Sequence, residues 1–213
     1  LMLEGTAFPP EALATVVTHA QTDAPPQPGR HRFPLVVLSP GFGNSRATLT
    51  GLAEELASQG YVVAGIDHTY EAAGISFPDG RVAACRVCAN PEPVAARITS
   101  GRARDVSFVL DRLLARRPAW SGGQVIDPAR IAMAGHSIGG SAVSAAMVTD
   151  RRIDVGLNLD GTVQLSLPPR GLDRPFVLLG AEKHGTPGDD PSWTKTWNHL
   201  TGWKRWISVE GTD

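Results

Sequence analysis

The sequence has few cysteines, few lysines and no long run of apolar residues. It contains three lysines and two cysteines among 213 residues. No apolar stretch approaches the roughly 18 residues that cross a membrane, and the first residues show no signal-peptide pattern. Because the chain begins with Leu1 rather than methionine, a removed leader is compatible with the sequence, and we favour secretion over a cytoplasmic location.

An excess of charge of either sign is also absent. Arginine and lysine together number 20 against 21 aspartates and glutamates, which gives a formal net charge of -1. A chain so close to neutrality has no general attraction for nucleic acid or anionic membranes. The arginine-rich segment 100–117 has helical spacing, with Val106, Leu110 and Leu113 on one face. We expect its arginines to lie largely on the solvated side: Arg102, Arg104, Arg112, Arg116 and Arg117.

The two cysteines, Cys85 and Cys88, are too few to form a closed zinc site without a nearby cluster of histidines or cysteines. Their Cys-Arg-Val-Cys motif also lacks the strand-then-helix setting of a redox-active pair. Two states stay open, namely free thiols or a small local disulfide.

The composition fits one globular domain, residues 1–213. Apolar residues make up 42% and charged residues 19% of the chain, which is enough apolar content for a substantial core. Residues 1–32 contain five prolines, and we expect them to wrap irregularly over the surface, with a short strand from Thr15 to His19. Residues 33–213 then form the core.

The core alternates between strand and helix patterns, which predicts an α/β fold with a mostly parallel sheet and helices on both faces. Apolar runs of strand length occupy residues 33–39, 61–66, 130–134, 153–159, 175–180 and 205–209. Helical patterns occupy residues 48–59, 100–117, 141–147 and 194–203. The irregular segment 67–99, with a turn at 77–80, follows a strand end and is expected to border a site.

The segment 134–140, Ala-Gly-His-Ser-Ile-Gly-Gly, contains a Gly-x-Ser-x-Gly motif between a predicted strand and a predicted helix. In that context the motif is typical of a nucleophile elbow, where a tight turn strains the serine backbone and the glycines allow close packing. Ser137 is therefore the candidate nucleophile. The pentapeptide alone also occurs by chance in glycine-rich chains, so its flanks and a second motif upstream decide between the two interpretations.

That second motif is Ser39-Pro40-Gly41-Phe42-Gly43, directly after the first long strand. A serine nucleophile needs hydrogen-bond donors for the oxyanion that forms when it attacks. We assign this role to the backbone amides of Phe42 and of Ile138, the residue after the candidate nucleophile. A simple turn is the alternative for Pro-Gly-Phe-Gly, and the pairing with the elbow argues against it.

Together these residues resemble the α/β-hydrolases, specifically the branch of platelet-activating-factor acetylhydrolases and related bacterial lipases and esterases. The resemblance rests on segments 33–46, 67–68, 135–140 and 156–161. It implies an α/β-hydrolase fold, carboxyl-ester hydrolysis and no cofactor. Compared with that family, the chain is expected to lack N-terminal strands, which would lie upstream of Leu1, and the C-terminal loop that carries the histidine.

The catalytic acid has two candidate positions. Many hydrolases carry it after the strand equivalent to residues 175–180, often as Gly-Ala-Glu-x-Asp, but here Gly-Ala-Glu-Lys is followed by His184. Asp160, which ends the preceding strand, matches the place of the acid in the acetylhydrolase-like branch, and we choose it over an Asp-Gly turn. Glu182, Asp189 and Asp190 are weaker candidates.

The catalytic base is missing from its expected place. The family order is serine, acid, histidine, with the histidine in the loop after the final strand, but residues 210–213 read Glu-Gly-Thr-Asp. We therefore expect the histidine just beyond Asp213. Among the histidines in the chain, His68 could line the pocket or act as base by its position at a strand end, and His184 is comparable.

The other aromatic and imidazole side chains have less specific expectations. His136 neighbours Ser137, but its side chain should point away, and we keep it, with Trp193, as a pocket-lining candidate. His199 is expected on a helix, and His19 and His31 on the surface.

The sequence thus favours a serine carboxyl-ester hydrolase that acts through an acyl-enzyme on apolar acyl or aromatic esters. A polyester (cutinase-like) hydrolase or a thioesterase is an alternative within the same chemistry. A catalytically silent binding module with this fold is the alternative from another class. Acyl and alcohol specificity and oligomeric state stay open at this stage, and the expected partner is a small-molecule, lipid or polymer ester.

Overall fold

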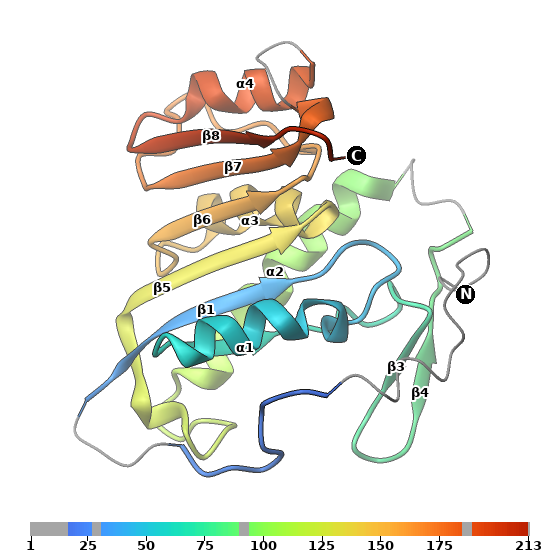
Figure 1. Ribbon diagram of the computed structural model, residues 1–213, viewed down its shortest axis with the longest axis vertical. Helices are drawn as coiled ribbons and strands as arrows, with labels where there is room; N and C mark the ends of the chain where they lie inside the picture. The colour runs from blue at the N-terminus through green and yellow to red at the C-terminus, as the bar shows by residue number, and fades with distance from the viewer. Residues whose placement is uncertain (1–16, 27–30, 90–93, 185–188, 213) are drawn as a thin grey trace.

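The computed structural model describes residues 17–26, 31–89, 94–184 and 189–212. Within these residues, six parallel strands form one sheet in the order β2-β1-β5-β6-β7-β8. The strands are β1 (Phe33–Ser39), β2 (Val62–Gly65), β5 (Ile126–His136), β6 (Val155–Leu159), β7 (Phe176–Ala181) and β8 (Lys204–Val209). Figure 1 shows the sheet twisting from β1 to β8. The parallel sheet that the sequence pattern predicted is confirmed.

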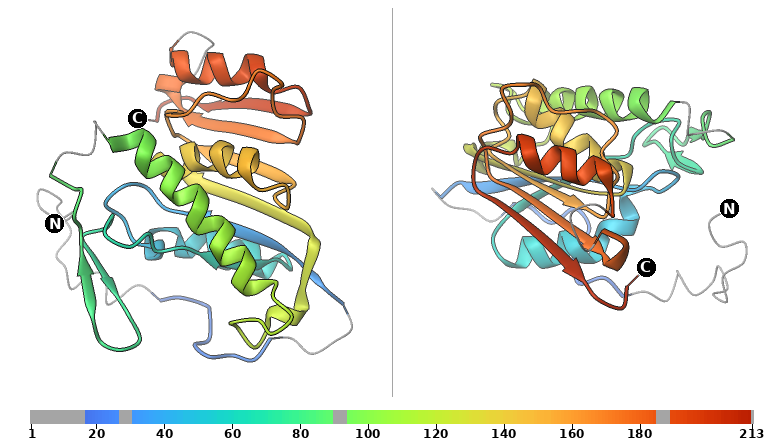
Figure 2. Two further views of the ribbon diagram at one scale, coloured as in Figure 1. Left: turned by 180° about the vertical axis from the view of Figure 1, so that it is seen from behind. Right: turned by 90° about the horizontal axis from the view of Figure 1, so that it is seen from above.

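Helices cover both faces of this sheet. Helix α1 (Thr50–Ser58) lies on one face, and α2 (Ala95–Leu113) and α3 (Ile138–Thr149) lie on the other (Figures 1 and 2). Alternate residues of β1 supply the two cores: Leu35 and Val37 belong to the larger cluster with α2 and α3, whereas Val36 and Leu38 pack with α1. Because both faces are covered, the strand reads as a continuous apolar run. Among the described residues, no helix is long and apolar enough to cross a membrane.

Helix α4 (Pro191–His199) packs against the last two strands of the sheet, β7 and β8. Asp190 caps this helix, and its side chain accepts a hydrogen bond from the amide of Ser192 at 2.7 Å. Trp193 is fully buried in the larger core cluster, so α4 packs on the same face as α2 and α3. The helix begins three residues before the predicted start, because the Asp-Pro pair at 190–191 provides a capping signal that the tryptophan spacing alone does not reveal.

The segment 67–99, predicted to be irregular, contains a small antiparallel hairpin. Strands β3 (Gly74–Ser76) and β4 (Val82–Ala84) flank the predicted turn at 77–80, and Figure 1 shows the hairpin beside the main sheet. Three-residue strands are too short for a clear alternating pattern. Cys85 and Cys88, which follow β4, form a disulfide, so the second of the two open states is the one observed.

Two further expectations need comment. Residues 17–19 are not in a strand, and the start of the strand expected from Thr15 lies outside the described residues. Arg102, expected on the solvated side of α2, is instead 1% exposed. Its spacing explains this burial, because Arg102, Val106 and Leu113 recur at helical intervals on the face of α2 that packs on the core.

Candidate active site

The turn between β5 and α3 has the geometry of a strained elbow. Ser137 sits between the two elements with φ 55° and ψ -123°, a conformation that non-glycine residues rarely adopt. A Cβ on Gly135 would lie 2.3 Å from the backbone of Gly139, and a Cβ on Gly139 would lie 2.2 Å from the carbonyl oxygen of Ser39. Only glycine fits at both positions, so the glycines bring β5, α3 and the end of β1 together beneath the serine.

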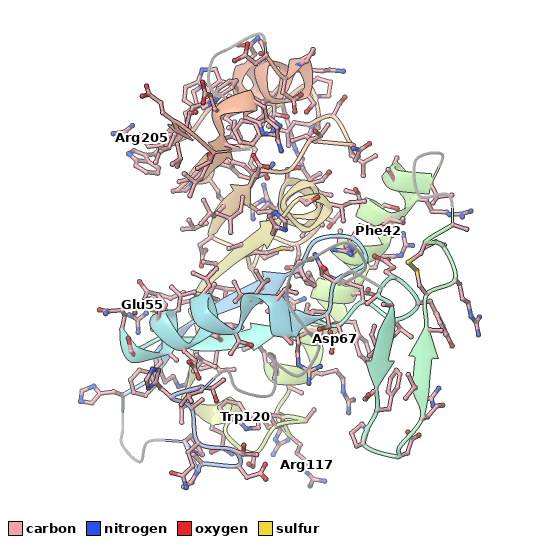
Figure 3. The ribbon with its side chains drawn as sticks, turned by 45° about the vertical axis from the view of Figure 1, so that its right-hand side comes forward. Phe42, Glu55, Asp67, Arg117, Trp120 and Arg205 are labelled. Atoms are coloured by element: carbon pink, nitrogen blue, oxygen red, sulfur yellow. A yellow bond between two sulfur atoms is a disulfide. The ribbon has the colours of Figure 1, made fainter. Side chains whose placement is uncertain are left out.

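The loop after β1 lies next to this elbow and supplies one of the two candidate oxyanion donors, the amide of Phe42. The amide of Ile138 is in the first turn of α3, where backbone N–H groups have no partner within the helix. In the part of the chain that the structure describes, the amide of Phe42 makes no hydrogen bond, and neither does the hydroxyl of Ser137. Figure 3 shows Phe42 in the loop that leads away from β1. The three residues that carry these groups line one cavity.

Asp160 follows β6, the strand next to β5, at the same edge of the sheet. Its Oδ1 accepts hydrogen bonds from the amide of Ala181 at 2.8 Å and from Nδ1 of His184 at 2.7 Å, and its Oδ2 lies 3.0 Å from Nζ of Lys183. Burial alone raises the pKa of Asp160, but the three donors together outweigh burial and hold that pKa below its usual value. The carboxylate is therefore ionised at neutral pH.

His184 is buried between two carboxylates. Nδ1 bonds Asp160, Nε2 lies 3.1 Å from Oδ2 of Asp190, and the ring stacks on Trp193 with 4.4 Å between ring centroids. Both ring nitrogens are therefore engaged away from Ser137. This arrangement orients Asp160 and ties α4 to the sheet, which the sequence did not indicate because His184 and Asp190 belong to different local patterns.

One cavity of about 810 Å³ brings these candidates together. Its lining includes Phe42, Ser137, Ile138, Asp160 and His184. His136, Lys183, Asp189 and Asp190 also line it. The carboxyl ends of parallel strands meet at this edge, which explains why residues more than 100 positions apart share one cavity.

The structure places two of the expected pocket residues elsewhere. Trp193 is fully buried, and its indole N–H donates to the carbonyl of Gly161 at 2.7 Å. His68 is 2% exposed and bonds Ser39 and Asp105. Neither side chain lines the cavity that contains Ser137. His68 ends up behind the sheet edge because the chain after β2 turns inward against α2 rather than toward the cavity.

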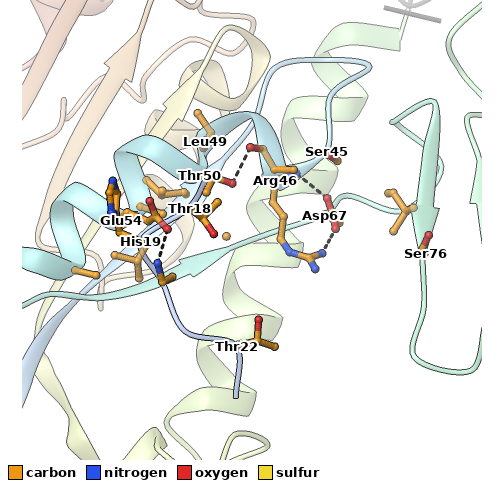
Figure 4. Close-up of a pocket in the computed structure, with 18 of the residues that line it drawn as sticks. Thr18, His19, Thr22, Ser45, Arg46, Leu49, Thr50, Glu54, Asp67 and Ser76 are labelled. Atoms are coloured by element: carbon orange, nitrogen blue, oxygen red, sulfur yellow. Dashed lines mark hydrogen bonds and ion pairs between the residues drawn. The ribbon is translucent and has the colours of Figure 1, made fainter. Parts of the chain in front are cut away.

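The remaining histidines are distant from the nucleophile or lack contact with it. His199 is partly buried at the end of α4, where its Nδ1 donates to the carbonyl of Lys195 at 2.9 Å. His31 is exposed. His19 lines a second cavity, also about 810 Å³, between α1, the segment 18–22 and the hairpin (Figure 4). That cavity holds an Arg46–Asp67 ion pair but none of the candidate catalytic residues.

Comparison with known proteins finds relatives that are named as acetylhydrolases or esterases. Residues 6–86 match the family model for platelet-activating factor acetylhydrolase, isoform II. A protein of Arthroderma benhamiae named "Probable 1-alkyl-2-acetylglycerophosphocholine esterase" is 31% identical over 190 residues, which cover 84% of this chain and 46% of that protein. The platelet-activating factor acetylhydrolase of Gallus gallus is 24% identical over 94% of this chain and 56% of its own length.

A solved structure gives a further likeness. The ferulic acid esterase of Streptomyces cinnamoneus is 46% identical, with a TM-score of 0.78, over 86% of this chain and 52% of that protein. The chain therefore spans about half the length of the relatives it matches.

Proposed function

We propose that this chain, which belongs to the α/β-hydrolase superfamily, acts as a serine carboxyl-ester hydrolase through an acyl-enzyme. One observation carries the proposal: Ser137, Phe42 and the ionised Asp160 line one cavity, and among the described residues neither the Ser137 hydroxyl nor the Phe42 amide has a hydrogen-bond partner. A serine hydroxyl beside amide donors and an oriented carboxylate supplies the components that acyl transfer requires, apart from the base. The names of the relatives favour carboxyl esters as substrates.

In the proposed reaction, Oγ of Ser137 attacks the ester carbonyl while a histidine base takes its proton. The amides of Phe42 and Ile138 stabilise the tetrahedral oxyanion. The histidine then protonates the leaving alcohol. In the second half of the reaction, a water molecule attacks the acyl-enzyme while the histidine takes its proton, and the histidine returns that proton to Oγ of Ser137 as the acid leaves. Asp160 stays ionised throughout and orients the histidine, in agreement with the direction of its pKa.

The base in this mechanism is the histidine that we expect just beyond Asp213. The amide of Glu182 donates to the carbonyl of Thr212 at 3.1 Å, and the amide of Gly211 donates to Glu182 Oε2 at 3.0 Å. The chain after β8 thus runs beside the turn 182–184 that contacts Asp160. We propose that a histidine shortly after Asp213 reaches Oδ2 of Asp160. Sequencing the natural protein past this point tests the assignment, and a downstream segment without histidine contradicts it.

The substrate side of the proposal rests on the side chains around the nucleophile. Phe42 and Ile138 give the cavity an apolar wall beside the oxyanion donors, which suits an apolar acyl group or an aromatic ester. The relatives' names include a ferulic acid ester, which is aromatic, and an acetyl phospholipid, which carries a short acyl group. The names therefore favour neither aromatic esters nor short-chain acyl esters over the other. A panel of p-nitrophenyl esters of increasing acyl length, together with a feruloyl ester, a polyester film and an acyl thioester, separates these substrates.

A catalytically silent binding module remains the second candidate, favoured by one observation. Both ring nitrogens of His184, the histidine nearest the candidate acid, are occupied by Asp160 and Asp190. Fluorophosphonate labelling of the natural protein that carries this sequence discriminates between the two functions. We expect labelling that is lost in Ser137→Ala and kept in Ser144→Ala, a serine buried in the same helix. Absence of labelling in the wild type contradicts the hydrolase.

A further inference from the structure

A buried polar cluster lies directly behind the loop that carries Phe42. Oγ of Ser39, at the end of β1, lies 2.9 Å from Nε2 of His68, whose Nδ1 lies 2.7 Å from Asp105. Arg102 pairs with Glu71 at 2.7 Å and with Ser39 Oγ at 3.3 Å. Three elements meet here, namely β1, the segment after β2, and α2. The proposed mechanism uses none of these five side chains.

The Ser39, His68 and Asp105 contacts follow the order of a serine-histidine-acid triad, but their burial rules out direct chemistry. Ser39 is 0% exposed and His68 is 2% exposed, so no substrate carbonyl reaches the hydroxyl. With Asp105 accepting the Nδ1 proton, Nε2 of His68 accepts from the Ser39 hydroxyl. The lone pairs of that hydroxyl then accept from Arg102. The hydrogen bonds from Asp105 through His68 to Ser39 therefore hold the Ser39 hydroxyl in place as a partner for Arg102.

Arg102 is the centre of the cluster and contacts the loop itself. Its guanidinium also donates to the carbonyl oxygen of Pro40, the residue two positions before Phe42. Burial lowers the pKa of Arg102, and the neighbouring Glu71 carboxylate opposes that effect. A buried charge is costly unless it is fully paired, and here its partners are Glu71, Ser39 and Pro40.

The same residues hold the other end of the loop. The amide of Gly43 donates to the carbonyl of Glu71 at 3.0 Å, and the amide of Ala73 donates to the carbonyl of Gly43 at 3.3 Å. Glu71 therefore contacts Gly43 through its backbone and Arg102 through its side chain. Phe42 lies between Pro40 and Gly43, which these contacts fix, and within the part of the chain that the structure describes its amide has no hydrogen-bond partner.

We infer that Arg102 is a positioning residue, which fixes the Pro40 carbonyl so that the Phe42 amide points at the developing oxyanion. The inference rests on the proposed hydrolase function. An amide donor contributes to catalysis only when it lies at hydrogen-bond distance from the oxyanion, and a misplacement of about 1 Å costs roughly 100-fold in rate. A guanidinium that contacts both the loop and the segment beside it prevents such a shift.

The test measures steady-state ester hydrolysis and inhibition by a trifluoromethyl ketone in the natural protein and in Arg102→Lys. The ketone forms a tetrahedral adduct with the serine and so reports oxyanion binding. We expect kcat to fall roughly 10- to 100-fold with KM within about twofold, and affinity for the ketone to fall in parallel with kcat/KM. Lysine keeps the positive charge but lacks the planar guanidinium, whose several N–H donors contact Pro40, Ser39 and Glu71 together.

Two variants complete the test. Glu71→Gln keeps the size of the side chain and an acceptor for Arg102, and we expect the same selective loss in kcat and ketone affinity at a smaller, roughly 3- to 10-fold level. Arg152→Gln is the matched control, because Arg152, in the segment after α3, pairs with the nearby Asp150 and with Asp111 of α2, away from the loop. It should lower thermal stability while kcat and ketone affinity stay within about twofold.

The possible outcomes distinguish a failure of the positioning role of Arg102 from a failure of the proposed hydrolase function. If folded Arg102→Lys and Glu71→Gln keep wild-type kcat and ketone affinity, the positioning role is wrong and the hydrolase stands. A loss in these variants that is matched by Arg152→Gln also overturns it, since the effect is then one of general stability. If the wild type is neither labelled by fluorophosphonate nor active on any ester, the hydrolase fails and the positioning role fails with it.

Discussion

A single methyl group at Gly139 offers a sharp test of how closely the elbow packs against the loop 39–43, which carries the amide of Phe42. The Cβ of Gly139→Ala would lie 2.2 Å from the carbonyl oxygen of Ser39 and 2.7 Å from that of Pro40, whereas real Cβ contacts stay beyond 3.0 Å. The start of α3 and the loop must therefore separate by about 0.8 Å. Both atoms that the methyl group meets are backbone, so no side-chain rotation relieves the overlap.

This separation moves the amide of Ile138 away from that of Phe42. Because a shift near 1 Å costs roughly 100-fold in rate, we expect kcat of Gly139→Ala to fall about 30- to 100-fold, or about 2–2.7 kcal/mol in activation free energy. Overpacking should also lower the free energy of unfolding by about 1–3 kcal/mol. Hydrolysis of a p-nitrophenyl ester measures the first effect, and urea unfolding followed by circular dichroism measures the second.

Gly51→Ala is the matched control for this substitution. A Cβ on Gly51 meets nothing within 4 Å, and the residue lies in helix α1, so alanine should stabilise the protein by up to about 1 kcal/mol with kcat unchanged. A Gly139→Ala protein that is folded and keeps kcat within about twofold of wild type would refute the reasoning, because the methyl group would then fit without moving the loop.

Three further predictions concern the carboxylates and His184. Asp160→Asn should lower kcat by about 10⁴-fold with little change in KM, because the base loses its orienting partner; a loss below tenfold in ester hydrolysis would argue against Asp160 as the acid. His184→Gln should lower the melting temperature yet keep fluorophosphonate labelling within about tenfold; a folded variant without labelling would instead identify His184 as the base. The Arg152 hydrogen bonds, partly opposed by burial, lower the pKa of Asp150 to about 2. Its stabilisation is therefore complete above the unfolded pKa of about 3.9 and is lost as pH falls toward 2. In Asp150→Asn, unfolding at pH 7 should cost about 1–2 kcal/mol less after allowance for solvent screening, and the drop in stability below pH 4 should be shallower.

Much of the fold follows from local patterns in the sequence. The apolar run of β1 predicts a strand covered on both faces, and the structure shows alternate residues packing on opposite helical layers. The Gly-x-Ser-x-Gly motif predicts an elbow because its steric requirements are local, and Ser137 has the expected positive φ. Such features involve neighbours in the chain, so their residue types alone indicate them.

The parts that the sequence did not reveal depend on partners far apart in the chain. Arg102 looked like one more surface arginine, although its interval of four residues to Val106 places it on the buried face. What decides its role is the carbonyl of Pro40, 62 positions away. His184 similarly has its position fixed by Asp160, 24 positions upstream. No spacing rule encodes these pairs: the first forms only when α2 packs behind the end of β1, and the second only when β6 and β7 lie side by side.

The same reasoning explains why the two halves of the candidate site differ in how they are held. Ser137 is fixed by backbone strain and by glycines that admit no side chain, so its position follows from the elbow alone. The loop around Phe42 is held partly by its own backbone, through the hydrogen bond from the Asn44 amide to the Gly41 carbonyl, and partly by Arg102 in α2 and its partner Glu71 in the segment after β2. Substitutions at the elbow should therefore act through packing. Those behind the loop should act through electrostatics and reach the chemistry only through the placement of one amide.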